Sequence, residues 1–151
     1  MTRHVLGAPM KADKRAAYGD ALVSFLGSKR AVIDYFIKNL DRLTNKSIGV
    51  MTADSVFAAI ALFLSADKAW GVLSLVALVA LLLAVGLCCS NLVSTSSGLA
   101  SAKVTEDDIL RHGLTVNMAR TVRFTLALYL SGAGFVLLLL QIIMQLVGRL
   151  T

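Results

Sequence analysis

The sequence predicts an all-α protein with three transmembrane helices, an amphipathic helix before them and a long third transmembrane helix that extends into the cytoplasm. Apolar residues make up 57% of the 151 residues and charged residues only 16%, whereas soluble domains hold about 45–50% apolar and about 25% charged residues. The apolar residues gather in three blocks, Ser47–Ala66, Ala69–Ser90 and Phe124–Val147. Each block has the length of about 20 residues that a helix needs to cross a hydrocarbon core of about 30 Å.

Residues 1–46 are predicted to form a cytoplasmic leader followed by an amphipathic helix. Within Ala16–Lys46, leucine, isoleucine and phenylalanine recur at steps of three and four residues, and charged residues fill much of the remaining face. Gly27-Ser28 is a candidate break in this helix. Two roles stay open for the helix: packing against the membrane surface or another cytoplasmic helix, and sensing or docking of a partner.

Residues 47–90 are predicted to form a transmembrane helical hairpin. Only Ala66–Ala69 separates the first two apolar blocks, and a connection this short permits only a tight turn between the helices. Trp70 follows the connection, where indole rings concentrate at a membrane interface. The second helix carries a face of small residues suited to close helix packing. This face consists of Ala77, Ala80, Ala84 and Cys88.

A serine-rich cytoplasmic linker is predicted over residues 91–104, and a long helix over residues 105–151. Thr105 followed by three acidic residues is typical of a helix start, because the hydroxyl caps the first turn and acids suit its positive end. No proline interrupts the chain from there to Gly148. A continuous helix of this length would be about 65 Å long, so its first third is expected to project into the cytoplasm.

The distribution of lysine and arginine predicts the orientation in the membrane. Residues 1–46 hold nine of these residues and residues 91–123 hold four, whereas the hairpin connection and the C-terminal tail hold one each. Because cytoplasmic loops of membrane proteins collect basic residues, we expect the N-terminus in the cytoplasm and the C-terminus on the opposite side.

Neither enzyme activity nor nucleic-acid binding is predicted. The net charge of +6 follows from the basic cytoplasmic segments, and no basic segment interleaved with aromatic residues occurs in the sequence. His4 and His112 lie in different segments, and no nucleotide-binding or hydrolase motif is found. The adjacent Cys88 and Cys89 have no further ligand cluster beside them in the sequence, so no metal or other cofactor is expected.

Small and polar residues form a stripe along the last helix. From Gly113 to Gln145 they recur at alternating steps of four and three residues, which is a heptad pattern. Small residues let helices approach closely, and glutamine amides hydrogen-bond between helices. Packing within the chain, self-association and the lining of a pore all stay open. The candidate site residues of this stripe are Asn117, Arg120, Ala127, Ser131, Gly134, Gln141 and Gln145.

Asp54 is the only acidic or basic residue inside an apolar block. Acids at membrane depth are costly, and they are therefore candidates for functional sites. Two interpretations stay open for Asp54. One is structural pairing with Lys46 or Arg123 at the cytoplasmic boundary, and the other is a role in gating or ion passage.

The order of elements resembles the transmembrane effector family of the cyclic-pyrimidine antiphage defence system (Pycsar), and next the SLATT group of defence effectors. In the Pycsar family a charged helix leads into a short motif at the first span, and a cytoplasmic helix runs into the last span. Leu43–Val50 ("LTNKSIGV") resembles the first motif, with Lys46 at its lysine and Thr44 where the family has an acid. Met118–Phe135 ("MARTVRFTLALYLSGAGF") resembles the boundary of the last span.

This resemblance implies a multi-pass protein of the bacterial inner membrane, with a cytoplasmic N-terminus and a periplasmic C-terminus. The expected function is an oligomeric effector that impairs or permeabilises the membrane in antiphage defence, controlled through its cytoplasmic helices. A nucleotide signal is implied only by the resemblance. The alternative is a non-catalytic accessory or structural subunit of a larger membrane complex. The expected partners are the lipid bilayer and either further copies of the chain or other subunits.

Overall fold

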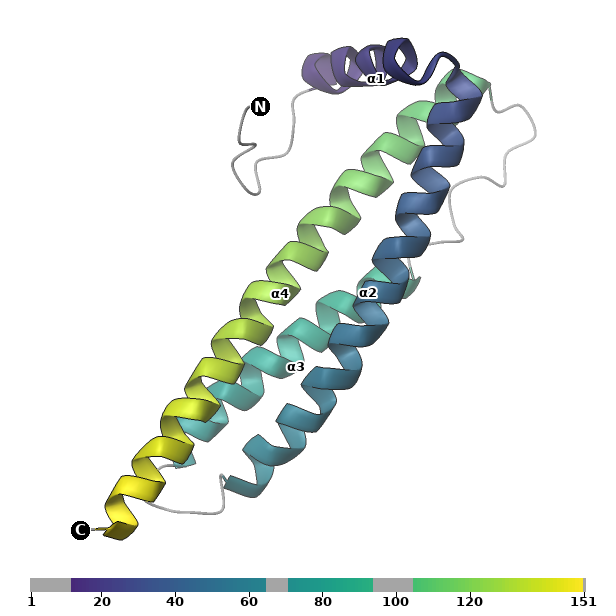
Figure 1. The fold of residues 1–151 in the computed structure, drawn as a ribbon. Helices are drawn as coiled ribbons and strands as arrows, with labels where there is room; N and C mark the ends of the chain where they lie inside the picture. Colours follow the sequence, from purple (N-terminus) through teal and green to yellow (C-terminus); the bar gives the residue numbers. More distant parts are fainter. Residues whose placement is uncertain (1–11, 65–70, 94–104, 151) are drawn as a thin grey trace.

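The computed structural model describes residues 12–64, 71–93 and 105–150, and nearly all of these residues are helical (Figure 1). The predicted all-α class is therefore confirmed. The predicted hairpin connection and residues 94–104 of the predicted linker lie outside the described residues. Residues 91–93, predicted as the start of the linker, instead belong to the last turn of a helix that continues to Val93. The helices are α1 (Ala12–Leu26), α2 (Lys29–Leu64), α3 (Gly71–Val93) and α4 (Glu106–Leu150).

The junction of α1 and α2 confirms the candidate break at Gly27 and Ser28. Gly27 has a φ of +81°, a left-handed conformation that glycine adopts readily because it has no Cβ. Its amide donates a hydrogen bond to the Val23 carbonyl oxygen at 2.9 Å. The Ser28 hydroxyl accepts a hydrogen bond from the Ala31 amide at 3.2 Å, which caps the start of α2. α1 consequently lies across the end of the bundle (Figure 1).

α2 continues without a break through the boundary predicted between residues 46 and 47. The helix predicted over Ala16–Lys46 is therefore divided between α1 and the first half of α2, and the second part belongs to the same 36-residue helix as the first span. The polar segment Asp41–Lys46 contains neither glycine nor proline, so the change in composition is not a change in backbone conformation.

α2 and α4 run parallel and in register. Side chains that meet across their interface are 77 or 78 residues apart in sequence from one end of the interface to the other. A constant difference is what two parallel helices with the same rise produce, and the contacts extend over about 42 Å. The pairs are Lys29–Asp107, Asn39–Asn117, Asp54–Ser131 and the tilted rings Phe57–Phe135.

α3 runs antiparallel to α4 and packs against both long helices (Figure 1). The backbones are close, because a Cβ added at Gly134 would lie 2.8 Å from Leu81 Cγ and 3.3 Å from the Ala77 carbonyl oxygen. Ala80, predicted in the small face, is half-buried, since the heptad phase rather than side-chain size decides which residues face inward. The buried residues of α3 are Ser74, Ala77, Leu81, Ala84, Cys88 and Asn91.

α2 and α4 extend beyond the end of α3. α3 has 23 residues, a length of about 35 Å that is close to the hydrocarbon core of about 30 Å. α4 has 45 residues. Asn91, near the end of α3, lies beside Arg120, so residues 106–119 of α4 and the matching residues 29–42 of α2 lie past α3. We call this pair of segments the overhang.

A hydrophobic cluster joins α1 to the overhang. Val32 and Phe36 of α2 are buried against Leu110 and Leu114 of α4. A Cβ added at Gly19 of α1 would lie 3.2–3.3 Å from the methyl groups of these two leucines. α1 is thus held by close apolar contact. Half-buried side chains complete the cluster, namely Leu22, Val23, Leu26 and Met118.

α2, α3 and α4 are long and apolar enough to cross a membrane, so each of the three predicted spans belongs to a helix that could be one. Large apolar side chains cover their outward faces, including Val79, Leu82 and Leu83 on α3 and Leu139 and Leu140 on α4. Soluble monomers rarely expose contiguous apolar surface of this extent, whereas lipid tails are as apolar as leucine. The outer surface is therefore that of a membrane protein.

Candidate functional site

Polar side chains lie along the interior of the bundle, between helices whose outer faces are apolar. Among the described residues, six polar or charged side chains are buried. Hydrogen bonds between helices connect several of them to further polar groups. We call the whole set the polar file. It consists of Asn39, Ser47, Asp54, Ser74, Asn91, Asn117, Arg120, Ser131 and Gln141.

The polar file begins in the overhang. Asn39 Nδ2 donates a hydrogen bond to Asn117 Oδ1 at 2.7 Å, between equal levels of the parallel helices. One turn further along α4, the Arg120 side chain is buried. Its backbone carbonyl oxygen accepts a hydrogen bond from Asn91 Nδ2 at 3.3 Å. Asn91 thereby ties the end of α3 to α4 at the level where the overhang begins.

Asp54 lies at the centre of the polar file. Its side chain is fully buried, and Oδ1 accepts a hydrogen bond from the Ser131 hydroxyl at 2.5 Å. Its second carboxyl oxygen, Oδ2, has no hydrogen-bond partner among the described residues. The buried Ser47 hydroxyl, two turns earlier on α2, lies close to the Cys88 thiol of α3. All three spans therefore contribute polar groups at this depth.

The structure pairs Asp54 with Ser131 and not with the boundary bases Lys46 and Arg123. Lys46 precedes Asp54 by eight residues, and Arg123 precedes Ser131 by eight residues. Each base therefore lies about 12 Å nearer the overhang than the carboxyl group. Lys46 is also exposed. The interpretation as a structural ion pair at the cytoplasmic boundary is thus not what the structure shows.

The polar file ends near the C-terminal end of α4. The Ser74 hydroxyl of α3 donates a hydrogen bond to Gln141 Oε1, and both side chains are buried. Gln141 Nε2 has no hydrogen-bond partner in the described part of the chain. Gln145, one turn further on, is half-buried. The membrane segment therefore contains polar contacts at both ends and at its centre.

The stripe predicted on the last helix faces α2 and α3 of the same chain. Arg120, Ala127, Gly134 and Gln141 are buried. These four positions are therefore covered by other helices of the same chain. The other candidate residues of the stripe are half-buried, namely Asn117, Ser131 and Gln145.

Four members of the polar file were not predicted from the sequence: Asn39, Ser47, Ser74 and Asn91. Ser74 and Asn91 stand at the two ends of the heptad pattern on α3, so extending that pattern by one step in each direction would have found them. Asn39 and Ser47 belong to the buried face of α2, whose phase is hidden by the charged residues around them.

Replacing Ser74 by alanine is expected to lower the free energy of unfolding by about 0.6–1.7 kcal/mol, because Gln141 Oε1 then loses its partner in a site away from water. The double variant Ser74→Ala with Gln141→Leu should recover part of this loss, since neither polar group remains unpaired. Unfolding in mixed detergent micelles measures both values. Met144→Leu, on the outer face of α4, is the control. Gln141→Leu alone is measured as well, and a double variant whose loss equals the sum of the losses of the two single variants would contradict the pairing.

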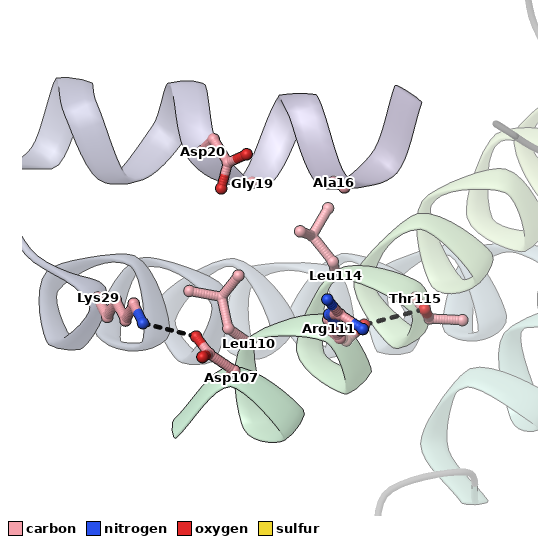
Figure 2. A pocket seen from close by; sticks show the side chains of 9 residues that line it. All are labelled: Ala16, Gly19, Asp20, Lys29, Asp107, Leu110, Arg111, Leu114 and Thr115. Atoms are coloured by element: carbon pink, nitrogen blue, oxygen red, sulfur yellow. Dashed lines mark hydrogen bonds and ion pairs between the residues drawn. The ribbon is translucent and has the colours of Figure 1, made fainter. Parts of the chain in front are cut away.

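A cavity of about 640 Å³ lies between α1 and the first turns of α2 and α4 (Figure 2). Its lining includes the acids Asp20 and Asp107 and the bases Lys29 and Arg111. Lys29 Nζ lies 2.6 Å from Asp107 Oδ1, and both side chains are largely exposed, so water screens this ion pair and it contributes little to stability. Charges of both signs leave the cavity without a preference for anions or cations.

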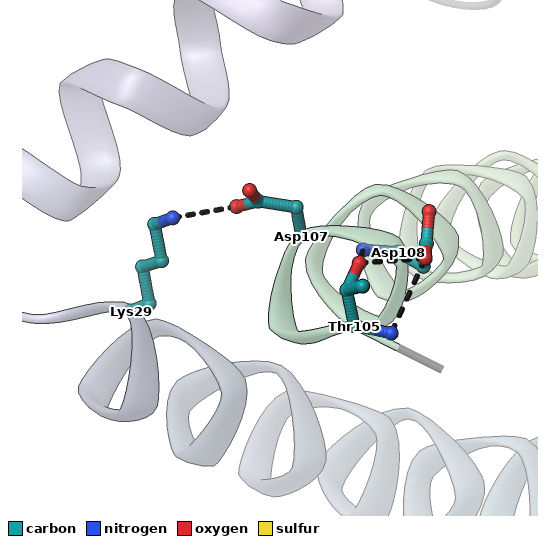
Figure 3. A network of polar contacts seen from close by, with 4 residues as sticks. All are labelled: Lys29, Thr105, Asp107 and Asp108. Carbon is teal, nitrogen blue, oxygen red and sulfur yellow. Dashed lines mark hydrogen bonds and ion pairs between the residues drawn. The ribbon is translucent and has the colours of Figure 1, made fainter. Parts of the chain in front are cut away.

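The start of α4 carries the predicted cap (Figure 3). The Thr105 hydroxyl accepts a hydrogen bond from the Asp108 amide at 3.3 Å, and the Thr105 amide donates to Asp108 Oδ2 at 3.2 Å, as in a capping box. The Thr105 hydroxyl also donates to this carboxylate at 2.6 Å. The bond that the Thr105 hydroxyl donates to the carboxylate has the largest effect, followed by the bond from the Thr105 amide. Together they hold the pKa of Asp108 below its usual range. The cap fixes the start of α4 in the overhang, away from the polar file.

The fold and the polar file together define the class of this chain: an α-helical membrane protein with three spans and a polar interior. Comparison with family models, with curated proteins and with solved structures gave no match.

Proposed function

We propose that this chain is a bacterial inner-membrane effector that permeabilises the membrane when its cytoplasmic helices receive a signal, and that it acts as an oligomer. The proposal includes a cytoplasmic N-terminus and overhang and a periplasmic C-terminus. The observation that carries it is the polar file, whose buried polar atoms in the membrane segment lack partners among the described residues at Asp54, Gln141 and Ser47.

Such atoms are an unfavourable feature for a bundle that serves only as an anchor. A buried donor or acceptor without a partner costs about 1–3 kcal/mol, and apolar residues at the same positions would avoid this cost. Water inside the bundle would hydrogen-bond these atoms and remove the cost. The packed bundle is therefore poised toward a hydrated state in which small solutes or ions can cross the membrane.

Control through the overhang is supported by the continuity of the long helices. α2 and α4 run unbroken from the overhang into the membrane segment. A movement of the cluster around Phe36 and Leu114 would therefore be transmitted to Asp54 and Ser131. Three helices enclose no wide channel, so a passage larger than a file of water requires several copies. The alternative is an accessory subunit whose unpaired polar atoms are completed by a partner's helices.

The test is depolarisation of bacterial cells that express the chain, followed with a potential-sensitive dye. The wild type is expected to depolarise cells. A variant with an apolar file, Ser47→Ala with Asp54→Leu and Gln141→Leu, should insert equally well but lose this effect. The matched control is Thr52→Val with Ser55→Ala and Thr125→Val. It removes three hydroxyl groups that bond only to the backbone of their own helices.

A control variant as inactive as the apolar-file variant would contradict the role of the polar file. A wild type that is harmless, both alone and together with the product of a neighbouring gene, would contradict the effector function itself. In that case the mass of the detergent-solubilised complex, measured with and without other subunits, tests the accessory-subunit alternative.

The proposed orientation predicts which end of α4 reacts with a membrane-impermeant maleimide in intact cells. In a background of Cys88→Ala with Cys89→Ala, Gly148→Cys is expected to react and Glu106→Cys to stay protected. Both positions are exposed on the helix, so protection reports on the membrane and not on folding. Permeabilised cells should give labelling at both positions. The reverse pattern in intact cells would overturn the orientation derived from basic residues.

A further inference from the structure

The Asp54 carboxyl group occupies a site with one hydrogen-bond donor and no counter-charge. The side chain is fully buried, Oδ1 accepts a hydrogen bond from the Ser131 hydroxyl, and Oδ2 has no partner among the described residues. Burying a carboxylate without a cation costs far more free energy than burying the neutral acid. The geometry therefore favours the protonated acid while the bundle stays packed.

The neighbouring helices bring no charge to this level. From α3, the Cys88 thiol is the titratable group close enough to interact with Asp54. On α4, the nearest bases are Arg123 and Arg120, eight and eleven residues before the level of Ser131. On α2, the nearest is Lys46, eight residues before Asp54. α1 lies over the overhang, at the end of the bundle where α4 begins (Figure 1).

The site has too few oxygen atoms for a metal cation. Calcium takes about six to eight oxygen ligands and magnesium about six, whereas the hydrogen bond at this site joins two oxygen-bearing side chains of the described residues, Asp54 and Ser131. In the part of the chain that the structure describes, no three His, Cys, Asp or Glu side chains gather into a possible metal site. A proton needs only one oxygen with a free lone pair, and Asp54 Oδ2 provides it.

We propose that Asp54 is a reversible proton-binding site whose state decides whether water enters the polar file. In the packed bundle the proton is bound to Oδ2. On release the O–H bond breaks, its electron pair stays on the carboxylate, and the proton passes to water to form hydronium. The charged carboxylate then requires hydration, and the same water reaches Gln141. Only the consequence for membrane permeability rests on the proposed function.

Protonation is tested on the full chain in liposomes with dicyclohexylcarbodiimide, an apolar reagent that adds to the O–H of a protonated carboxyl group. Mass spectrometry locates the adduct. We expect labelling at Asp54 that decreases as the pH rises, and no adduct at that position in Asp54→Asn. The exposed acids Asp34 and Asp41 on the same helix are internal controls, because their side chains face water.

Water entry is tested by the reactivity of Cys88 toward a small thiol reagent, in a background of Cys89→Ala. Cys88 is fully buried in the packed bundle. Thiols react faster as the pH rises in any protein, so Asp54→Asn, which is permanently neutral, supplies the intrinsic pH dependence. As the pH rises, the reactivity of Cys88 is expected to increase more steeply in the wild type than in Asp54→Asn. The additional increase is at most about tenfold per pH unit, because a single proton is released.

A second variant reports on the hydrogen bond to the carboxyl group. Ser131→Ala removes the donor that stabilises the ionised form, so the rise in Cys88 reactivity should move to higher pH. The proposal is overturned if Asp54 stays unlabelled at all pH values, or if Cys88 has the same pH profile in wild type and Asp54→Asn. Neither measurement involves depolarisation of cells. If the proposed function fails but the proton-binding site is real, Asp54 is labelled and Cys88 shows the pH dependence, while the membrane potential of cells stays unchanged.

Discussion

Gly134→Leu is expected to disrupt the packing of α3 on α4 more than any other single substitution among the glycines of the described residues. Even a Cβ at this position would lie 2.8 Å from Leu81 Cγ and 3.3 Å from the Ala77 carbonyl oxygen. The backbone oxygen cannot rotate away, so the two helices must separate. Overpacking of a core costs about 1–3 kcal/mol and occasionally more, and we expect the upper end of this range. Unfolding in mixed detergent micelles measures the loss.

Gly132→Leu is the matched control, because a Cβ at Gly132 has no neighbour within 4 Å and the residue is exposed two positions away on the same helix. It should keep wild-type stability. Gly134→Leu should also lose depolarisation of cells, since displaced helices no longer align the polar file. Equal stability of the two variants would show that α3 does not approach α4 as closely as described.

Phe36→Ala is expected to release the overhang and α1 while the membrane segment stays folded. Phe36 is 3% exposed at the centre of the cluster that joins α1, α2 and α4. Removing a buried phenylalanine side chain costs about 3–5 kcal/mol. Hydrogen exchange should therefore accelerate over residues 29–42 and 106–119 and remain slow over α3. Phe25→Ala, whose side chain is 85% exposed on α1, is the control and should leave the exchange unchanged.

The same variant tests control through the overhang. If the packed overhang restrains the membrane segment, Phe36→Ala should permeabilise cells at lower expression than the wild type does. If Phe36→Ala loosens the overhang without any change in depolarisation, the overhang does not regulate the polar file, and the cytoplasmic control that we propose is wrong.

The three spans and the helix break could be predicted from the sequence because they depend on local properties. The length of an apolar block decides whether a helix can cross a bilayer, and Ser47–Ala66, Ala69–Ser90 and Phe124–Val147 are all long enough. Gly27 and Ser28 end one helix and begin the next through bonds to residues three or four positions away. None of these features requires knowledge of distant contacts.

The heptad stripe on α4 was also visible in the sequence, but its partner was not. A heptad pattern states that a face packs against a helix, without stating which helix or which chain. Only the tertiary structure shows that Arg120, Ala127, Gly134 and Gln141 are covered by α2 and α3 of the same chain.

The partner of Asp54 depends on the relative placement of two helices. Their place at the predicted cytoplasmic boundary suggested Lys46 and Arg123 as partners, yet the parallel register of α2 and α4 brings together residues 77 or 78 positions apart. That register is set by contacts along the whole interface, from Lys29–Asp107 to the Phe57–Phe135 ring pair. It therefore places Ser131 beside the carboxyl group and leaves both bases about two turns away, since each turn advances about 5.4 Å.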